Sequence, residues 1–164
     1  IDESKLLEWD HLQPGSKTPL RFKVLLELCR RFHEEPMNLG VQFSSSRDIY
    51  HHFQTRLGNL KQERFIIVIL DNKHRFLSET TVTVGLLNRS LVHPREVFAE
   101  AIEQRAAAII CIHNHPSGDS SPSEEDKRIT RRLQESGELL GIPLLDHVII
   151  SKEDFTSFAD EGWL

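Results

Sequence analysis

The chain has 164 residues, of which 38% are hydrophobic and 27% are charged, and its formal net charge is −5. This size and composition fit one soluble globular domain with a small appendage. The acidic balance argues against a protein that wraps nucleic acid, because such domains are usually basic. We find no signal peptide and no apolar run long enough for a membrane helix, so we expect a cytoplasmic protein without membrane contact. The first residue is Ile1 rather than Met, so we also expect a fragment or a processed product.

Two cysteines, Cys29 and Cys111, lie far apart, each within an apolar run. We expect them to be reduced, buried thiols, as in cytosolic proteins. The sequence has no C-x-x-C pair, which excludes a zinc site built from paired thiolates.

Residues 1–40 predict an N-terminal helical appendage and a linker. Thr18-Pro19 is a typical helix start, apolar residues recur after it at helical spacing, and Pro36 ends the pattern. The helix over residues 18–33 is basic and could contact phosphate, although a solvated helix face is the more common reason for such charges. We place the domain boundary near residue 40 and expect the main domain to span residues 41–164.

The first half of the main domain predicts a helix followed by a β-hairpin. Three serines at 44–46 are typical N-cap residues for a short helix over residues 47–53. The continuous β-branched run over residues 65–70 predicts a strand buried on both faces. Residues 71–74 predict a turn, and the alternation over residues 76–86 predicts a second strand that pairs with the first.

The second half predicts helices that alternate with buried strands. We expect a helix from Pro94 to about residue 104, a strand over residues 106–112 and a strand over residues 144–150. Between these two strands, Ser123 caps a long helix that Gly141 closes. The order of elements predicts an α/β (α+β) fold, a three-layer sandwich in which helices flank a mixed sheet. In the helix predicted from Pro94, the apolar stripe consists of Val97, Phe98, Ala101 and Ile102.

The most informative pattern is H-x-H, then seven residues, then S-x-x-D, at His113, His115, Ser123 and Asp126. Residues two apart on a strand point to the same face, so both imidazoles leave the strand end together. A carboxylate after the following turn is able to fold back toward them. Two nitrogens and one oxygen around an open fourth position are typical of a catalytic zinc. We therefore predict a Zn²⁺ site held by the two histidines and Asp126.

Asp126 has a second interpretation, because Ser123-Glu124-Glu125-Asp126 matches a helix capping box. In that case Asp126 supports the start of the helix rather than a metal. For Ser123 the two interpretations are compatible, since its hydroxyl could cap the helix and also face an oxyanion beside the metal. Asp119 is the alternative carboxylate ligand, although aspartate after glycine is also common in turns.

A hydrolytic zinc site also needs a base that accepts a proton from water. Glu63 directly precedes the first buried strand and could reach a neighbouring site, although its spacing alone favours a polar residue that simply ends the preceding turn. Glu79 and Glu96 are the alternatives. His147 could lie at the edge of the site, but we favour a core histidine that is held by Asp146.

The spaced H-x-H and S-x-x-D pattern resembles the JAMM signature of the JAB/MPN metalloprotease domain. The resemblance covers roughly residues 40–164, and the flanking sequence segments are similar to those of its bacterial RadC branch. These segments are Leu70-Asp71-Asn72, Gly85-Leu86-Leu87-Asn88, Val92-His93-Pro94-Arg95-Glu96-Val97-Phe98, His113-Asn114-His115-Pro116-Ser117-Gly118-Asp119 and Leu145-Asp146-His147.

The resemblance implies a cytidine-deaminase-like JAB/MPN sandwich whose zinc is held by two histidines, one aspartate and a water. The family's upstream glutamate, which acts as the base, corresponds to Glu63. The family's serine, which steadies the tetrahedral intermediate, corresponds to Ser123. In the RadC branch a helix-hairpin-helix segment usually precedes this domain, and the basic helix over residues 18–33 is similar to its trailing end.

We therefore expect a zinc-dependent metallopeptidase that cleaves peptide or isopeptide bonds in a protein or peptide substrate. Two alternatives stay open. One is a DNA-repair-associated factor that binds nucleic acid through the basic N-terminal helix, and the other is a zinc-bearing interaction module without turnover. A zinc deaminase is excluded, because the sequence lacks an H-x-E followed by P-C-x-x-C.

Overall fold

The computed structural model of the chain describes residues 39–85 and 92–164. Almost all of the expected appendage over residues 1–40, including the basic helix, lies outside the described residues, and the domain boundary stays a prediction. The described elements, in chain order, are α2 (Ser46–Leu57), β1 (Arg64–Leu70), β2 (Phe76–Val84), α3 (Pro94–Glu103), β3 (Ala108–Asn114), α4 (Glu124–Leu140), β4 (Leu144–Ile150) and β5 (Phe155–Ser157).

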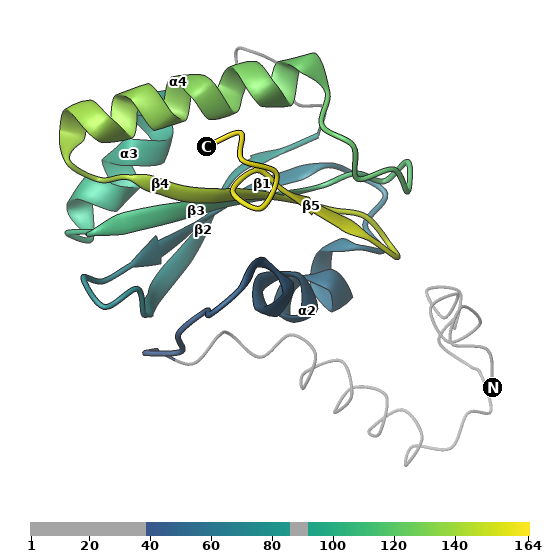
Figure 1. The fold of residues 1–164 in the computed structure, drawn as a ribbon, viewed down its shortest axis with the longest axis horizontal. Helices are drawn as coiled ribbons and strands as arrows, with labels where there is room; N and C mark the ends of the chain where they lie inside the picture. Colours follow the sequence, from purple (N-terminus) through teal and green to yellow (C-terminus); the bar gives the residue numbers. More distant parts are fainter. Residues whose placement is uncertain (1–38, 86–91) are drawn as a thin grey trace, which may run out of the picture. The chain divides into compact units, whose positions relative to one another are not determined.

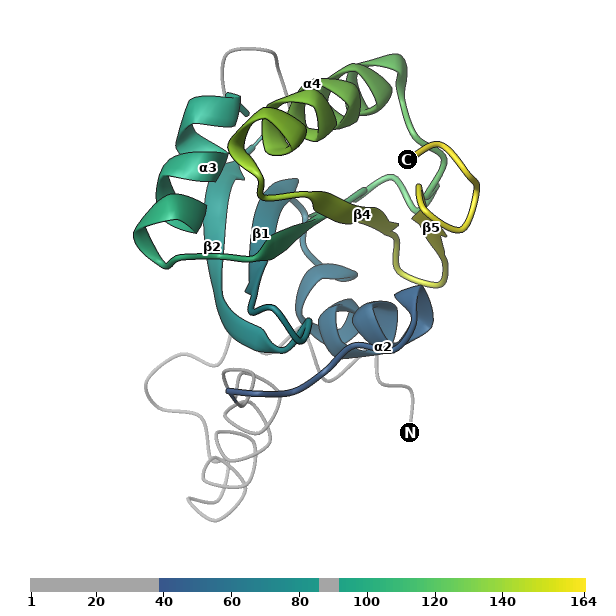
Figure 2. The same ribbon diagram turned by 60° about the vertical axis from the view of Figure 1, so that its left-hand side comes forward.

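The five strands form one mixed sheet in the order β2-β1-β3-β4-β5. β1 pairs antiparallel with both β2 and β3, β3 and β4 run parallel, and β5 is antiparallel to β4. Helix α2 covers one face of the sheet, and α3 and α4 lie on the other (Figure 1 and Figure 2). The expected three-layer α/β fold with a mixed sheet is therefore confirmed, and it is consistent with a JAB/MPN-like domain.

Helix α2 begins where the Ser45 side chain accepts a hydrogen bond from the backbone N–H of Asp48. Its residues Ile49, Phe53 and Leu57 recur at helical spacing and are buried. Fully burying a side chain of this size contributes about 1.5–3 kcal/mol, so these residues stabilise the packing of α2 on the sheet. The strand residues beneath the helix include Ile66, Val68, Ile110, Ile112, Val148 and Ile150.

Helix α4 is fixed at both ends and packs closely against the sheet. It begins after the N-cap Ser123 and ends at Gly141, whose φ of 71° is in the left-handed region that glycine adopts without strain. A Cβ on Gly137 would lie 2.5 Å from the carbonyl oxygen of Ile142 and 3.2 Å from the ring of Phe98 in α3. A glycine at position 137 therefore lets α4 approach α3 and the chain before β4 this closely.

Helix α2 is longer than expected, because it continues beyond residue 53 to Leu57. Further details also differ from the sequence-based expectations. β3 lies two residues later than expected, so His113 is inside the strand rather than beyond its end. Ile102 is 53% exposed, because the buried stripe of α3 is narrower and consists of Val97, Phe98 and Ala101. The strand β5 has no counterpart in the expectations, because its three residues are too few for a periodic pattern.

Cys111 is a free thiol that is fully buried in β3, as expected, and burial raises its pKa. Cys29 lies outside the described residues. Within residues 39–85 and 92–164, no helix combines the length and the apolar character that crossing a membrane requires.

Candidate metal centre

Two histidines lie on one face of the sheet at the C-terminal end of β3. His113, within the strand, is fully buried, and His115, just after it, has a side chain that is 13% exposed. The antiparallel register sets Phe65 of β1 opposite His113, and their rings stack with centroids 6.0 Å apart. Phe65 belongs to the core under α3 and α4, so both imidazoles face that layer, as the two-residue spacing predicts.

The carboxylate of Asp126, in the first turn of α4, is buried and approaches both rings. Its Oδ1 lies 3.4 Å from Nε2 of His113, and its Oδ2 lies 3.5 Å from Nε2 of His115. One potential ligand atom from each of the three residues lies within 4.8 Å of the others. The group His113, His115 and Asp126 is therefore able to bind a metal ion.

Ser123 orients the Asp126 carboxylate through the capping box. The backbone N–H and the hydroxyl of Ser123 both donate to Oδ2 of Asp126, over 2.7 and 2.6 Å, and the backbone N–H of Asp126 donates to the Ser123 hydroxyl. The capping-box interpretation is thus confirmed. It does not compete with the ligand interpretation, because the contacts that start the helix also aim the carboxylate at the histidines. The oxyanion role of Ser123 stays a prediction.

The loop after β3 orients His115. Its Nδ1 lies 2.8 Å from the backbone carbonyl oxygen of Asp119. A carbonyl oxygen only accepts, so Nδ1 carries the hydrogen and the lone pair of the neutral ring is on Nε2. The Asp119 carboxylate is exposed and accepts a hydrogen bond from the backbone N–H of Ser121. Asp119, the alternative ligand, therefore serves His115 through its main chain and lies outside the three-residue group.

On the buried side, the ring of His113 contacts a third histidine. Nδ1 of His113 lies 2.8 Å from Nε2 of His147 in β4, and Nδ1 of His147 lies 2.6 Å from Oγ1 of Thr130 in α4. His147 is fully buried, as expected of a core histidine. We expected Asp146 to hold the ring of His147, but its carboxylate contacts only the main chain of that residue, where it accepts a hydrogen bond from the backbone N–H. The imidazole itself is held by His113 and Thr130.

The charges of the cluster follow from this packing. Burial holds the pKa of His113 well below its ordinary value, and burial also lowers the pKa of His147 to about 4. Burial opposes charge on His115 as well, but hydrogen bonds to the Asp126 carboxylate and the Asp119 carbonyl raise its pKa. Burial alone would raise the pKa of Asp126, yet its contacts with His115 and His113 hold that pKa well below its usual range. Asp126 is thus ionised at neutral pH.

The two ring nitrogens that face each other fit a cation. Nε2 of His113 and Nε2 of His115 lie 2.8 Å apart. Two lone pairs at this separation repel each other unless a proton lies between them or both nitrogens bind one metal ion. Two imidazoles and one carboxylate are a donor set that zinc accepts, and other divalent metals also bind such ligands.

Glu63 lies directly before β1, and the register of β1 and β3, continued by two residues, sets it opposite His115. Asn114, between the two histidines, holds this part of the chain on both sides of Glu63. The backbone N–H of Arg64 donates to Oδ1 of Asn114 over 2.8 Å, and Nδ2 of Asn114 donates to the carbonyl of Gln62 over 3.1 Å. The charge of Glu63 contributes to the raised pKa of His115, so it acts on the cluster electrostatically. Its role as a base stays a prediction.

The alternative bases lie in ion pairs outside the cluster. Glu79 binds both terminal nitrogens of Arg56, in α2, over 2.6 and 2.8 Å. Glu96 pairs with Arg95 over 3.0 Å and is exposed. The sequence patterns single out neither Thr130 nor Asn114. Thr130 contacts His147, and Asn114 holds the chain on both sides of Glu63. The four-residue spacing from Asp126, which puts Thr130 on the same side of a helix, is a signal that could have found the first of them.

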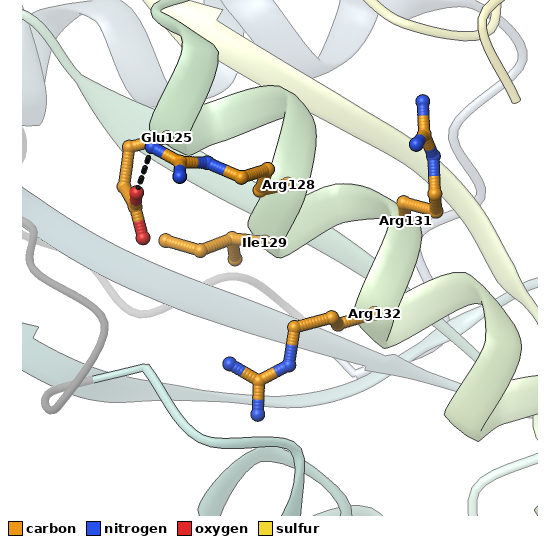
Figure 3. A pocket seen from close by; sticks show the side chains of 5 residues that line it. All are labelled: Glu125, Arg128, Ile129, Arg131 and Arg132. Atoms are coloured by element: carbon orange, nitrogen blue, oxygen red, sulfur yellow. Dashed lines mark ion pairs between the residues drawn. The ribbon is translucent and has the colours of Figure 1, made fainter.

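A hollow of roughly 340 Å³ lies on the flank of α4 (Figure 3). None of the three metal-site residues lines it, and Arg128 is paired there with Glu125 over 2.7 Å. Helix α4 carries five acidic residues against four basic ones, so it has no net positive charge. The residues that line the hollow are Glu125, Arg128, Ile129, Arg131 and Arg132.

Known proteins resemble this chain over most of its length. Three curated relatives, each named only as a UPF0758 protein, come from Syntrophotalea carbinolica, Geotalea uraniireducens and Methanosarcina mazei. The chain is 46%, 45% and 42% identical to them over 92%, 87% and 98% of its own length. It spans 66%, 62% and 69% of their lengths, so each relative contains further residues that this chain does not match. The family model of the RadC-like JAB domain matches residues 43–163, and the chain therefore belongs to the RadC family.

Proposed function

We propose that this domain is a zinc-dependent hydrolase that cleaves peptide or isopeptide bonds with an activated water. The observation that carries the proposal is the convergence of His113, His115 and Asp126 on one point. The charge of Glu63, which acts on His115, supports its part in the same site. The JAB family match supports the same reaction class. A zinc ion held by these residues would supply Lewis acidity and make water reactive near neutral pH.

The protein's own groups would divide the remaining work. Glu63 would accept a proton as the water oxygen bonds to the carbonyl carbon of the substrate. When the C–N bond breaks, Glu63 would return that proton to the leaving amine. The partial exposure of His115 and Glu63 leaves this side of the cluster accessible to a substrate, whereas His113 is closed off by the core.

Ser123 would act in two ways. Its contacts hold the carboxylate of Asp126 in place, and we propose that its hydroxyl also donates to the oxyanion that develops on the substrate. Removing one such donor typically costs about 3–4 kcal/mol of transition-state stabilisation. We propose a protein or peptide substrate, whose amide bond would release an amine that takes the proton from Glu63.

The test uses the zinc-loaded chain and a peptide library that contains both main-chain amide bonds and lysine ε-amide bonds, with products read by mass spectrometry. We expect cleavage by the wild-type chain. Glu63→Gln should bind zinc normally and lose turnover, since the amide cannot accept the proton. Glu79→Gln removes the same charge from an ion pair outside the cluster and should keep activity. Full activity of Glu63→Gln would remove Glu63 from the mechanism, and no cleavage of any bond by the wild-type chain would argue against a hydrolase.

The expected contact with nucleic acid stays a prediction. It depends on the basic helix over residues 18–33, which lies outside the described residues. Its test is the salt dependence of duplex binding, which should be steep if phosphate contacts carry the affinity.

A further inference from the structure

We propose that Thr130 and His147 are positioning residues that hold the ring of His113 with its Nε2 lone pair aimed at the metal. They do so through a chain of hydrogen bonds that begins at the backbone carbonyl of Asp126. The inference rests on the metal site proposed above. It concerns residues outside the H-x-H and S-x-x-D motifs, and it extends the site from three side chains to a buried network across α4, β4 and β3.

The direction of each hydrogen bond follows from the backbone carbonyl of Asp126, at which the series of hydrogen bonds begins. The Asp126 carbonyl oxygen lies 2.6 Å from Oγ1 of Thr130 and only accepts, so the Thr130 hydroxyl donates to it. With its hydrogen used, Thr130 Oγ1 accepts from Nδ1–H of His147 over 2.6 Å. Nε2 of the neutral His147 ring then has a lone pair, which accepts from Nδ1–H of His113 over 2.8 Å. The lone pair of His113 is therefore on Nε2, the atom that faces Asp126 and His115.

The network is buried, which gives these bonds their influence. Thr130 is 2% exposed, and His113 and His147 are completely buried, so water does not compete for their polar atoms. Phe158 stacks on His147 with ring centroids 4.9 Å apart, and Phe65 stacks on His113. Each member is carried by a helix or a strand rather than by a loop. Rotation or flipping of the His113 ring would therefore leave a buried donor or acceptor unsatisfied.

Asp126 links both ends of the network. Its carboxylate approaches Nε2 of His113, while its main-chain carbonyl fixes the opposite side of the same ring through Thr130 and His147. The first turn of α4 thus sets the ligand carboxylate and the tautomer of the ligand histidine together. Hydrogen-bond partners of this kind are typically worth about 10–100-fold in metal affinity.

The first experiment compares Thr130→Val with Thr130→Ser in the full chain. Valine nearly preserves the shape of threonine and removes the hydroxyl, whereas serine keeps the hydroxyl. Zinc affinity is measured by competition with a chromophoric chelator, and the folding of each metal-free variant is checked by circular dichroism and denaturant unfolding. We expect Thr130→Val to bind zinc about 10–100-fold more weakly and Thr130→Ser to stay within about threefold of wild type. Equal affinities of wild type and Thr130→Val, or equal losses in the two variants, would overturn the inference.

A second variant keeps the inference testable if valine destabilises the fold. His147→Phe retains an aromatic ring beside Phe158 and Phe65 but cannot accept from His113. If Thr130 acts through His147, the double variant should bind zinc no more weakly than His147→Phe alone. Additive losses would mean that the two residues act separately.

A spectroscopic measurement reads the network directly. Nitrogen NMR of the zinc-loaded chain should show His147 as the Nδ1–H tautomer in wild type, and an Nε2–H tautomer would contradict the assignment. These readouts do not need turnover. Zinc binding with the expected variant losses but without peptide cleavage would refute only the proposed hydrolase, while a wild-type chain that binds no zinc would refute both.

Discussion

The candidate site has two halves that are built differently. The buried half consists of His113, His147 and Thr130, which lie on two strands and a helix and hydrogen-bond to one another. The accessible half consists of His115 and Glu63, which lie at strand ends and are partly exposed. His113 is oriented by side chains far away in the sequence, whereas His115 is oriented by a main-chain carbonyl four residues later.

This difference indicates a division of labour. The buried half fixes geometry, because its hydrogen bonds are shielded from water and its residues cannot move without disturbing the core. In the proposed hydrolase the accessible half would meet the substrate, because His115 and Glu63 are its partly exposed residues. Mutations in the two halves should therefore separate metal binding, fold stability and turnover in different ways.

The largest effects are expected from the two ligand histidines. Both His113→Ala and His115→Ala should lose zinc, since each removes one of three protein ligands. Only His113→Ala should also strongly destabilise the metal-free protein, by about 2–4 kcal/mol, because it opens a buried space and leaves His147 without its partner. The measurements are metal content after dialysis and denaturant unfolding of the metal-free chains. Unchanged zinc stoichiometry in His115→Ala, or equal stabilities of the two variants, would break the comparison.

A smaller effect is expected at Asn114, which lies between His113 of the buried half and His115 of the accessible half. Asn114→Ala removes the two hydrogen bonds that hold the chain on either side of Glu63. We expect zinc to bind normally and turnover to fall about 10–100-fold, because a base displaced by about 1 Å loses its alignment with the water. The check is zinc titration together with kcat of the loaded chain. If turnover is unchanged, the position of Glu63 does not depend on Asn114.

The pH dependence of stability should report on the buried half. The pKa of His147 is about 4 in the folded chain against an ordinary value of 6.5, so below pH 6.5 the unfolded chain binds the proton more readily. Stability is therefore lost as pH falls from about 6.5 toward 4. Between pH 7 and pH 5 the loss from this one group should be about 1–2 kcal/mol. Denaturant unfolding of the metal-free chain at both pH values measures it, and His147→Phe should show a smaller loss than wild type. An identical pH dependence in that variant would mean that His147 is not held neutral.

The smallest effect is expected at Asp119. Its carboxylate is exposed and only its main-chain carbonyl contacts His115, so Asp119→Ala should keep zinc affinity within about threefold of wild type. Asp126→Asn, which removes the charge from the buried carboxylate, should weaken zinc binding far more. A comparable loss in both variants would show that Asp119 is a ligand after all.

The sequence predicts the local parts of this molecule well, because each depends on neighbouring residues. The apolar run that begins at Phe65, the capping box of Ser123 with Asp126, and the C-cap Gly141 are signals that a few residues carry alone. The convergence of His113, His115 and Asp126 is also local in origin, since a strand end and the next helix start bring them together.

The parts that could not be predicted depend on contacts across the sheet. His147 meets His113 only because β4 pairs in parallel with β3 in the register that sets Cys111 beside His147. No pattern near His147 encodes that register, and the adjacent Asp146 suggests a local partner for the ring instead. The exposure of Ile102 likewise depends on where α3 lies on the sheet, which its own periodicity does not determine.

The measurement that tests the central claim most directly is the metal content of the purified chain together with X-ray absorption at the zinc edge. We expect one zinc per chain with two imidazole nitrogens and one carboxylate oxygen at about 2.0–2.2 Å, and loss of this signal in His113→Ala and His115→Ala. A chain that holds no stoichiometric metal, or one whose metal keeps its coordination in both variants, would contradict the account.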